Sequence, residues 1–135
     1  MGTEITIRQA SVDDAVIIQA LLSQLDYVAE RSLVAEKMQH LLLGESDEVF
    51  VAEKDSRVVA FIALHYIPQL PLEGDFARIT YFCVTETVRS LGVGKLLEEH
   101  AQAAAARRGC DRIELHCHSR RTEAHRFYQR LGYLE

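Results

Sequence analysis

The sequence has few prolines, no tryptophan and no long apolar run. Its two prolines, Pro68 and Pro71, stand in a single short stretch, so nothing in the composition resembles a linker or a low-complexity segment. No apolar stretch approaches the length of about 20 residues that a membrane-spanning helix needs, and residues 1–4 lack the pattern of a signal peptide. We therefore expect a cytoplasmic protein that has no membrane partner.

Basic residues and paired cysteines are also scarce. The formal net charge is −5, which leaves no basic footprint for nucleic acid. Cys83, Cys110 and Cys117 form no C-x-x-C pair and are odd in number. They indicate reduced thiols, of which Cys83 and Cys117 are expected in the core, rather than a disulfide framework.

The remaining sequence is rich in periodic apolar residues, which suits one globular domain over residues 1–135. Alternation and helical periodicity predict the element order β-α-α-β-β-β-α-β-α. Because a strand–helix–strand unit forms a parallel crossover and the central hairpins are antiparallel, we expect an α/β fold with a mixed sheet and helices on both faces. The expected strands are 4–8, 48–53, 58–66, 78–84 and 113–118, and the expected helices follow Ser11 and cover 29–43, 91–108 and 121–131.

The stretch from residue 82 to 95 runs from an apolar strand through a glycine-bearing loop into a helix. Free backbone N–H groups at a helix start attract anions, and Gly92 and Gly94 leave the backbone open to close approach. Arg89 and Lys95 add positive charge. The stretch therefore predicts a phosphate-bearing ligand at residues 89–95, although a plain tight turn would also use these glycines. The Rossmann and Walker A patterns are absent.

Arg89-x-x-Gly92-x-Gly94 resembles the acetyl-CoA pyrophosphate loop of the GCN5-related N-acetyltransferase (GNAT) superfamily, in which Gln or Arg precedes two residues, Gly, one residue and Gly or Ala. A second resemblance is the C-terminal run 124–133, in which an alanine is followed by a tyrosine and Leu-Gly-Tyr. The order of elements also matches this family, so the resemblance implies the GNAT acyl-CoA N-acyltransferase fold with acetyl-CoA as cosubstrate. The cofactor-binding residues that it implies are Phe82, Cys83, Val84, Arg89, Ser90, Leu91, Gly92, Val93, Gly94, Lys95 and Arg121.

The resemblance assigns a role to the backbone of Val84, which stands where the family has the valine whose backbone contacts the pantetheine arm and the thioester. The run 84–89 matches the family's Val-x-Pro-x-x-Arg, with Glu86 in place of proline. Acetyl transfer also requires that the departing thiolate be protonated. On periodicity alone Tyr128 is a core aromatic residue, whereas the resemblance implies that Tyr128 is this general acid.

The general base is not evident from the sequence. The family often has a glutamate base in the strand that corresponds to residues 78–84, and this glutamate would align near Arg78. Arg121 stands where the family has an asparagine. Other candidate bases are Glu73, Asp75, Tyr81, Glu114, His116 and His118, and a water relay is an alternative. Arg120 and Arg121 suit either the 3′-phosphate or adenine of CoA or a plain exposed charge pair. His116, Cys117, His118 and His125 give no complete ligand pattern, so no metal is expected.

These observations predict an enzyme that transfers acetyl from acetyl-CoA to a primary amine of a small molecule or peptide, by direct attack in a ternary complex. The alternatives are a non-catalytic CoA-binding module of the same fold and a binding protein for another phosphate ligand. The acidic balance weakly favours a cationic acceptor. The chain ends at Glu135, before the family's usual last strand, and an uncovered sheet edge would favour a homodimer.

Overall fold

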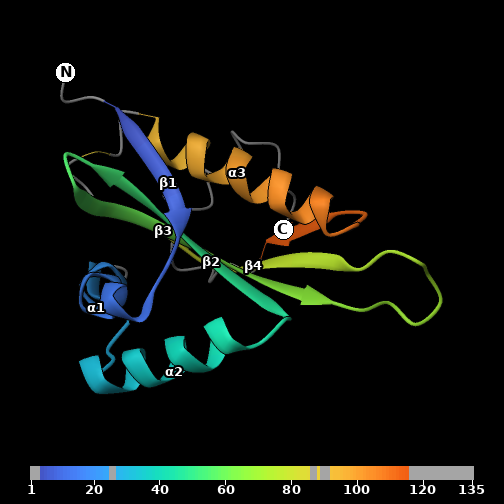
Figure 1. Ribbon diagram of the computed structural model, residues 1–135, viewed down its shortest axis with the longest axis horizontal. Helices are drawn as coiled ribbons and strands as arrows, with labels where there is room; N and C mark the ends of the chain where they lie inside the picture. Colours follow the sequence, from blue (N-terminus) through green and yellow to red (C-terminus); the bar gives the residue numbers. More distant parts are fainter. Residues whose placement is uncertain (1–3, 25–26, 86–87, 89–91, 116–135) are drawn as a thin grey trace.

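The computed structural model describes residues 4–24, 27–85, 88 and 92–115 (Figure 1). The expected order of elements is confirmed as far as the last strand, and the helix expected over 121–131 lies outside the described residues. The strands are β1 (Ile5–Gln9), β2 (Asp47–Lys54), β3 (Arg57–Ile67), β4 (Phe76–Val84) and β5 (Ile113–Leu115). The helices are the 3₁₀ turn η1 (Val12–Asp14), α1 (Ala15–Gln24), α2 (Arg31–Leu43) and α3 (Val93–Arg107).

The described strands form one mixed sheet in the order β1-β2-β3-β4-β5. Neighbouring strands are antiparallel, except that β4 and β5 are parallel and are connected through α3. The hairpin between β2 and β3 turns at Asp55 and Ser56, whose φ angles of 54° and 65° are both left-handed. Left-handed backbone at both central residues is typical of a type I′ turn, whose twist matches that of the two strands it connects. The parallel crossover and the antiparallel hairpins were both predicted.

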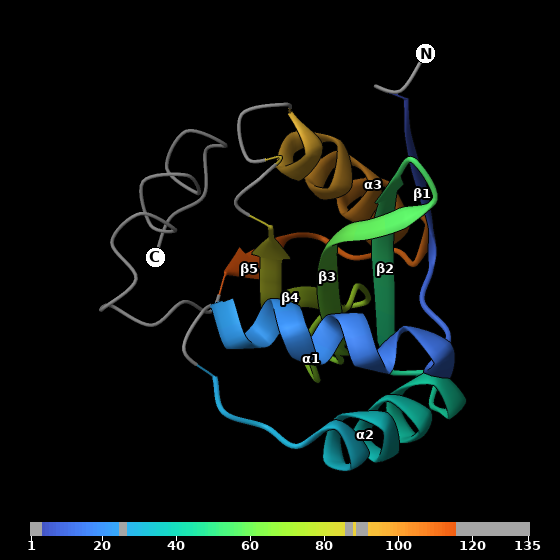
Figure 2. The same ribbon diagram turned by 90° about the vertical axis from the view of Figure 1, so that its left-hand side faces the viewer.

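Helices cover both faces of the sheet, as the sequence predicted. Figures 1 and 2 show α3 on one side of the strands and α1 with α2 on the other. The side chains divide accordingly: in β3, Ile62 and Leu64 belong to the cluster beneath α3, whereas Phe61 and Ala63 belong to the cluster beneath α1 and α2. Successive side chains of β3 point to opposite faces of the sheet, so this strand contributes to both hydrophobic cores.

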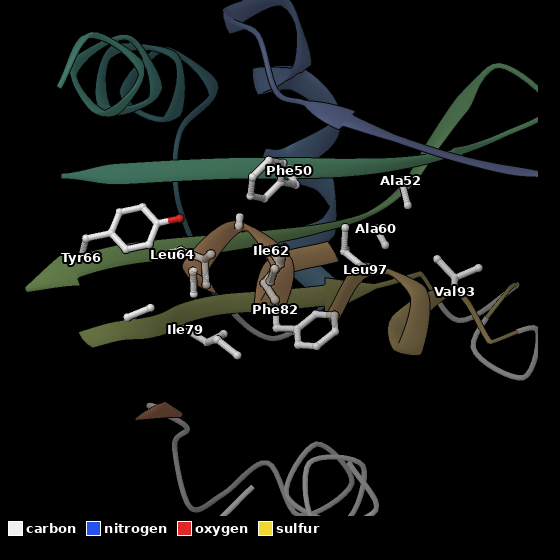
Figure 3. Packing of buried hydrophobic residues seen from close by; sticks show 14 of the residues in the cluster. Phe50, Ala52, Ala60, Ile62, Leu64, Tyr66, Ile79, Phe82, Val93 and Leu97 are labelled. Atoms are coloured by element: carbon white, nitrogen blue, oxygen red, sulfur yellow. The ribbon is translucent and has the colours of Figure 1, made fainter. Parts of the chain in front are cut away.

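Fully buried apolar residues attach α3 to the sheet. Val93, Leu97 and Ala101 have no exposed surface, and they pack in one cluster with Ile62 and Phe82 (Figure 3). Burial of apolar side chains contributes about 25 cal/mol for each Å² removed from water. This packing holds the N-terminal end of α3 near the end of β4.

A β-bulge interrupts β4 at Thr80. Ala63 of β3 pairs with Tyr81 and Leu64 pairs with Ile79, so Thr80 is an extra residue. Before the bulge the odd-numbered residue Ile79 faces α3, whereas after the bulge the even-numbered Phe82 does so. The bulge therefore reverses which side chains of β4 face each helical layer. This reversal was not predicted from the sequence.

The loop between β3 and β4 is tied to the turn between α3 and β5. The Gln69 amide donates to the Gly74 carbonyl oxygen (2.8 Å) and to Asp111 Oδ2 (2.9 Å). Arg112 Nη1 donates to Gln69 Oε1 (2.6 Å). A Cβ added at Gly74 would lie 2.9 Å from the carbonyl oxygen of Gly109, so the two backbones approach at a position that only glycine allows.

Candidate active site

The end of β4 leads directly to the start of α3. The β3–β4 ladder continues to Val84, which pairs with Ala60, and the Thr85 N–H then donates to the Val59 carbonyl oxygen (2.9 Å). The Val88 N–H donates to the Thr85 carbonyl oxygen (3.2 Å), and the Val88 side chain is buried in the α3 cluster. This buried valine anchors the connection, and its role was not inferred from the sequence.

Gly92 is the N-cap of α3 and has a left-handed backbone, with φ 79° and ψ 11°. Among the described residues, a Cβ at this position would meet no atom within 4 Å, so these residues leave the space outside the helix start open. The first N–H groups of any helix have no intrahelical acceptor, and the helix dipole adds partial positive charge there. The Gly92 carbonyl oxygen accepts from the Leu96 N–H (3.2 Å), which begins the helix. This geometry suits a phosphate group.

The predicted cofactor residues fall into two groups. Val93 and Gly94 are buried and Lys95 is exposed in the first turn of α3, and their roles in cofactor binding stay predictions. Arg89, Ser90, Leu91, Arg121 and the predicted acid Tyr128 lie outside the described residues. Their assignments remain predictions.

At the end of β4 the side chains of Phe82 and Cys83 are buried in the two cores. The predicted cofactor contacts of residues 82–84 would therefore be made by the backbone. Phe82 is buried beneath α3, and Cys83, which is 2% exposed, packs on the opposite face beneath α1 and α2. The expectation that Cys83 is a core residue is confirmed. Cys110 is a free, half-buried thiol whose pKa is raised by burial, and Cys117 lies outside the described residues.

Aromatic and polar side chains collect on the α1 side of the same strand end. The rings of Tyr27, in the segment between α1 and α2, and Tyr81, in β4, meet edge to face with centroids 5.3 Å apart. Tyr81 is 42% exposed. Gln24, the last residue of α1, donates from its amide to Thr85 Oγ1 (3.4 Å). Of these residues, only Tyr81 was named from the sequence as a candidate base, because the other three stand at no defined position of a motif.

Several candidate bases can now be placed. Glu114 accepts hydrogen bonds from Arg112, which has the larger effect, and from Arg78, and these bonds hold the pKa of its carboxyl below the usual range. A carboxylate of low pKa is a weak proton acceptor, so Glu114 is poorly suited to be the base. Glu73 and Asp75 precede β4, at the opposite end of that strand from Val84. Tyr81 lies nearer to Val84, whereas His116 and His118 lie outside the described residues.

A hollow of about 440 Å³ lies elsewhere, near the C-terminal ends of α2 and α3. Its lining includes Glu48, which accepts hydrogen bonds from the Tyr66 hydroxyl (2.5 Å) and the Gln9 amide (3.0 Å). Arg108 stacks over the Tyr66 ring at 4.3 Å. Because Arg108 follows the C-terminal end of α3, this hollow is separate from the Gly92 end of that helix.

The described ranges contain neither a metal-binding cluster nor a membrane-spanning helix. These ranges contain no group of three or more His, Cys, Asp or Glu side chains placed to hold a metal ion. The histidines of the run 116–118 and His125 fall outside those ranges. No helix in this part of the chain is long and apolar enough to cross a membrane.

Comparison with known proteins identifies the family. Residues 16–133 match the model of the acetyltransferase (GNAT) family. The aminoalkylphosphonate N-acetyltransferase of Salmonella typhimurium strain LT2 is 30% identical over 134 residues, which cover 96% of this chain and 84% of that protein. The chain therefore belongs to the GNAT family. It is a GNAT N-acetyltransferase, and acetyl-CoA is the acetyl donor of this family, so the predicted class, activity and cosubstrate are confirmed.

Solved structures give the same fold. A transcriptional regulator from Bacillus halodurans C-125 superposes with a TM-score of 0.87 at 24% identity, covering 97% of this chain and 93% of that one. An aminoglycoside N-acetyltransferase in complex with CoA superposes with a TM-score of 0.86 at 19% identity, covering 98% and 89%. At these identities the likeness establishes the GNAT fold but carries no substrate to this chain.

Proposed function

We propose that this enzyme acetylates a primary amine of a small molecule by direct attack on acetyl-CoA in a ternary complex. One observation carries this proposal: β4 ends beside an open, glycine-capped helix start, while tyrosines from β4 and the α1–α2 segment meet on the other side of the same strand end. The donor and the acceptor would then approach one strand end from opposite faces of the sheet. Holding two reactants in this way lowers the entropic part of the barrier.

Each chemical requirement has a proposed group. The pyrophosphate of CoA lies against the first turn of α3, with Gly92 and Lys95 beside it. The backbone N–H of Val84 faces the thioester oxygen and stabilises the oxyanion, and Tyr128 protonates the departing thiolate. Because Glu114 is held by two arginines, we do not assign the base to it; Tyr81, His116, His118 or a water relay would take the proton of the amine.

The choice of a small-molecule acceptor is supported by the name of the Salmonella relative, which describes the acetylation of aminoalkylphosphonates. We extend the proposal to a cytoplasmic location, a single domain and a homodimer. Sedimentation of the purified protein would test the homodimer, and a monomer at micromolar concentration would contradict it.

Turnover tests the proposed reaction. The protein is incubated with acetyl-CoA and a panel of amines, and both CoA thiol and acetylated amine are measured. We expect the rate of CoA release to saturate with the concentration of acetyl-CoA and with that of the amine. Tyr128→Phe should lower kcat by about 10²-fold or more, with the affinity for acetyl-CoA retained.

Tyr133→Phe is the matched control, since it removes a hydroxyl from the same C-terminal run and should leave kcat nearly unchanged. Acetyl-CoA binding without product from any amine would contradict the reaction and favour the non-catalytic CoA-binding module.

A further inference from the structure

A row of titratable side chains crosses four strands on the α1/α2 face of the sheet. The pairing registers place Asp47 of β2 opposite His65 of β3, His65 opposite Arg78 of β4, and Arg78 opposite Glu114 of β5. Directly paired residues in neighbouring strands have adjacent side chains on one face. We call Asp47, His65, Arg78 and Glu114 the polar row.

The alternation of neighbours shows which face the row occupies. In β4, Ala77 and Ile79 flank Arg78 and face α3, and in β5, Ile113 and Leu115 do the same on either side of Glu114. Arg78 and Glu114 therefore point to the other face. This is also the face of the half-exposed ring of Tyr81, because the bulge at Thr80 reverses the alternation between Arg78 and Tyr81.

The carboxylates of the row are already engaged. His65 Nδ1 lies 2.8 Å from Asp47 Oδ1. Glu114 Oε1 accepts from Arg78 Nη2 (3.3 Å), and Glu114 Oε2 accepts from Arg112 Nε (3.0 Å) and lies 2.9 Å from Arg112 Nη2. Two guanidinium groups thus share Glu114, and Arg112 also pairs with Asp111 (3.2 Å), so Arg78 has no carboxylate to itself among the described residues.

Arg78 uses only one of its five guanidinium N–H donors in the hydrogen bonds of the described residues. Its contacts within the described part of the chain are one bond to Glu114 and a position with Cζ 5.7 Å from the centre of the Phe76 ring. By contrast, Arg112 also bonds Gln69 and Asp111 and stacks on Phe76 at 4.3 Å. The Arg78 side chain is 40% exposed and that of His65 is 43% exposed. The Glu114 side chain is 36% exposed, but its oxygens already accept from two arginines, so Arg78 and His65 are the members of the row that still offer donors to a ligand.

The row is also placed on the strand that leads to the reaction centre. Arg78 precedes Val84 by six residues, which is about 15–20 Å of strand at ~3.3 Å per residue, less the bulge. Tyr81 lies between them on the same face, and Tyr27 covers Tyr81 from the α1–α2 segment. A molecule bound along this face could reach both the acetyl group and Arg78 only if it were elongated.

We propose that Arg78, with His65 beside it, is a specificity-determining site that binds an anionic group at the far end of the acceptor. The acceptor is then an elongated amine that also carries a carboxylate, phosphonate or phosphate. This inference rests on the proposed acetyl transfer and narrows its substrate class. It differs from the weak expectation of a cationic acceptor, because net charge averages the whole surface whereas Arg78 acts locally on the ligand.

Matched acceptors test the proposal. Amino alcohols, ω-amino acids and aminoalkylphosphonates of increasing chain length are compared by kcat/KM with saturating acetyl-CoA. We expect the anionic members to exceed the alcohols of equal length by about tenfold or more, the advantage appearing only above a threshold length. In Arg78→Gln the ratio should fall towards one. In Arg107→Gln, which removes an equal charge from the last turn of α3 on the other face, it should be unchanged.

A second readout does not depend on turnover. Methylphosphonate, which lacks an amine, should inhibit competitively against the amine and not against acetyl-CoA, and Arg78→Lys should retain part of this inhibition while Arg78→Gln loses it. An equal preference for alcohols and anions in the wild type, or a preference that survives Arg78→Gln, would overturn the proposal. Because acetyl transfer to the amino alcohols would still be measured in that case, failure of this proposal is distinguishable from failure of the reaction itself.

Discussion

At the scale of single residues, Asp14 shows how one carboxylate fixes a change of direction in the chain. Asp14 accepts two bonds from the Arg8 guanidinium, both 2.9 Å, and one from the Ser11 N–H (2.8 Å). It therefore joins β1 to the first turn of the helical layer while satisfying a free N–H at the helix start. The sequence predicted a helix that follows Ser11, but not the pairing of Asp14 with Arg8.

Replacing Asp14 should make stability less dependent on pH. The bonds from Arg8, and then from Ser11, hold the pKa of the Asp14 carboxyl below its usual value despite burial. A lowered folded-state pKa stabilises the protein above the unfolded value of about 3.9, and this stabilisation is lost as the pH falls through the folded value. Asp14→Asn should cost about 1–3 kcal/mol at pH 7, and the cost should shrink below about pH 4.

Urea unfolding across this pH range measures the effect, with Asp13→Asn as the control, since Asp13 is exposed in the same turn. A cost that does not change between pH 7 and pH 3 would contradict the ionic origin of the stabilisation.

At the scale of elements, the bulge in β4 decides which side chains form the core. Phe82→Ala should destabilise the protein by about 3–5 kcal/mol, because Phe82 is only 9% exposed beneath α3. Tyr81→Ala should cost much less, since Tyr81 is 42% exposed. An unbroken strand would reverse these two values, so chemical unfolding of the pair tests the bulge, and a larger loss for Tyr81→Ala would contradict it.

The strands and helices were predictable because their apolar periods are regular, whereas the bulge was not. Thr80 has no feature that distinguishes it from an ordinary strand residue, and its extra place is visible only once Ala63 and Leu64 define the pairing. The same limit applies to the polar row. His65 and Arg78 are thirteen positions apart in the sequence, and only the register of β3 and β4 makes them neighbours.

The glycine loop was predictable for the opposite reason. Gly92 and Gly109 are local signals, and both adopt the left-handed backbone, with φ 79° and 83°. Gly44 also ends its helix as predicted but in extended form, with φ −85°, so a stop signal alone did not reveal its backbone. The acceptor side carries no such signals: Gln24, Tyr27 and Thr85 come together only through the packing of the α1–α2 segment on β4.

At the scale of the whole molecule, the sheet separates the face proposed to bind acetyl-CoA from the face proposed to bind the acceptor, and β4 contributes side chains to both. The α3 face presents the glycine-capped helix start, and the α1/α2 face presents Tyr27, Tyr81 and the polar row. The end of β4 is the place where both faces are accessible from one backbone. A donor and an acceptor held on opposite faces can therefore meet there without competing for space.

The most direct test of the donor site is unfolding with and without acetyl-CoA in two matched variants. Gly92→Ala and Gly109→Ala place the same strain, about 1–2 kcal/mol, at opposite ends of α3, and neither new Cβ meets an atom of the described residues within 4 Å. Both variants should therefore unfold more easily than the wild type. At roughly 100 times its dissociation constant, acetyl-CoA should add about 2.7 kcal/mol to the wild type and to Gly109→Ala.

Gly92→Ala should lose most of this increase, and ATP should give none in any form of the protein. An equal increase in Gly92→Ala and Gly109→Ala, or an increase with ATP as large as that with acetyl-CoA, would contradict the assignment of the acetyl-CoA site to the start of α3.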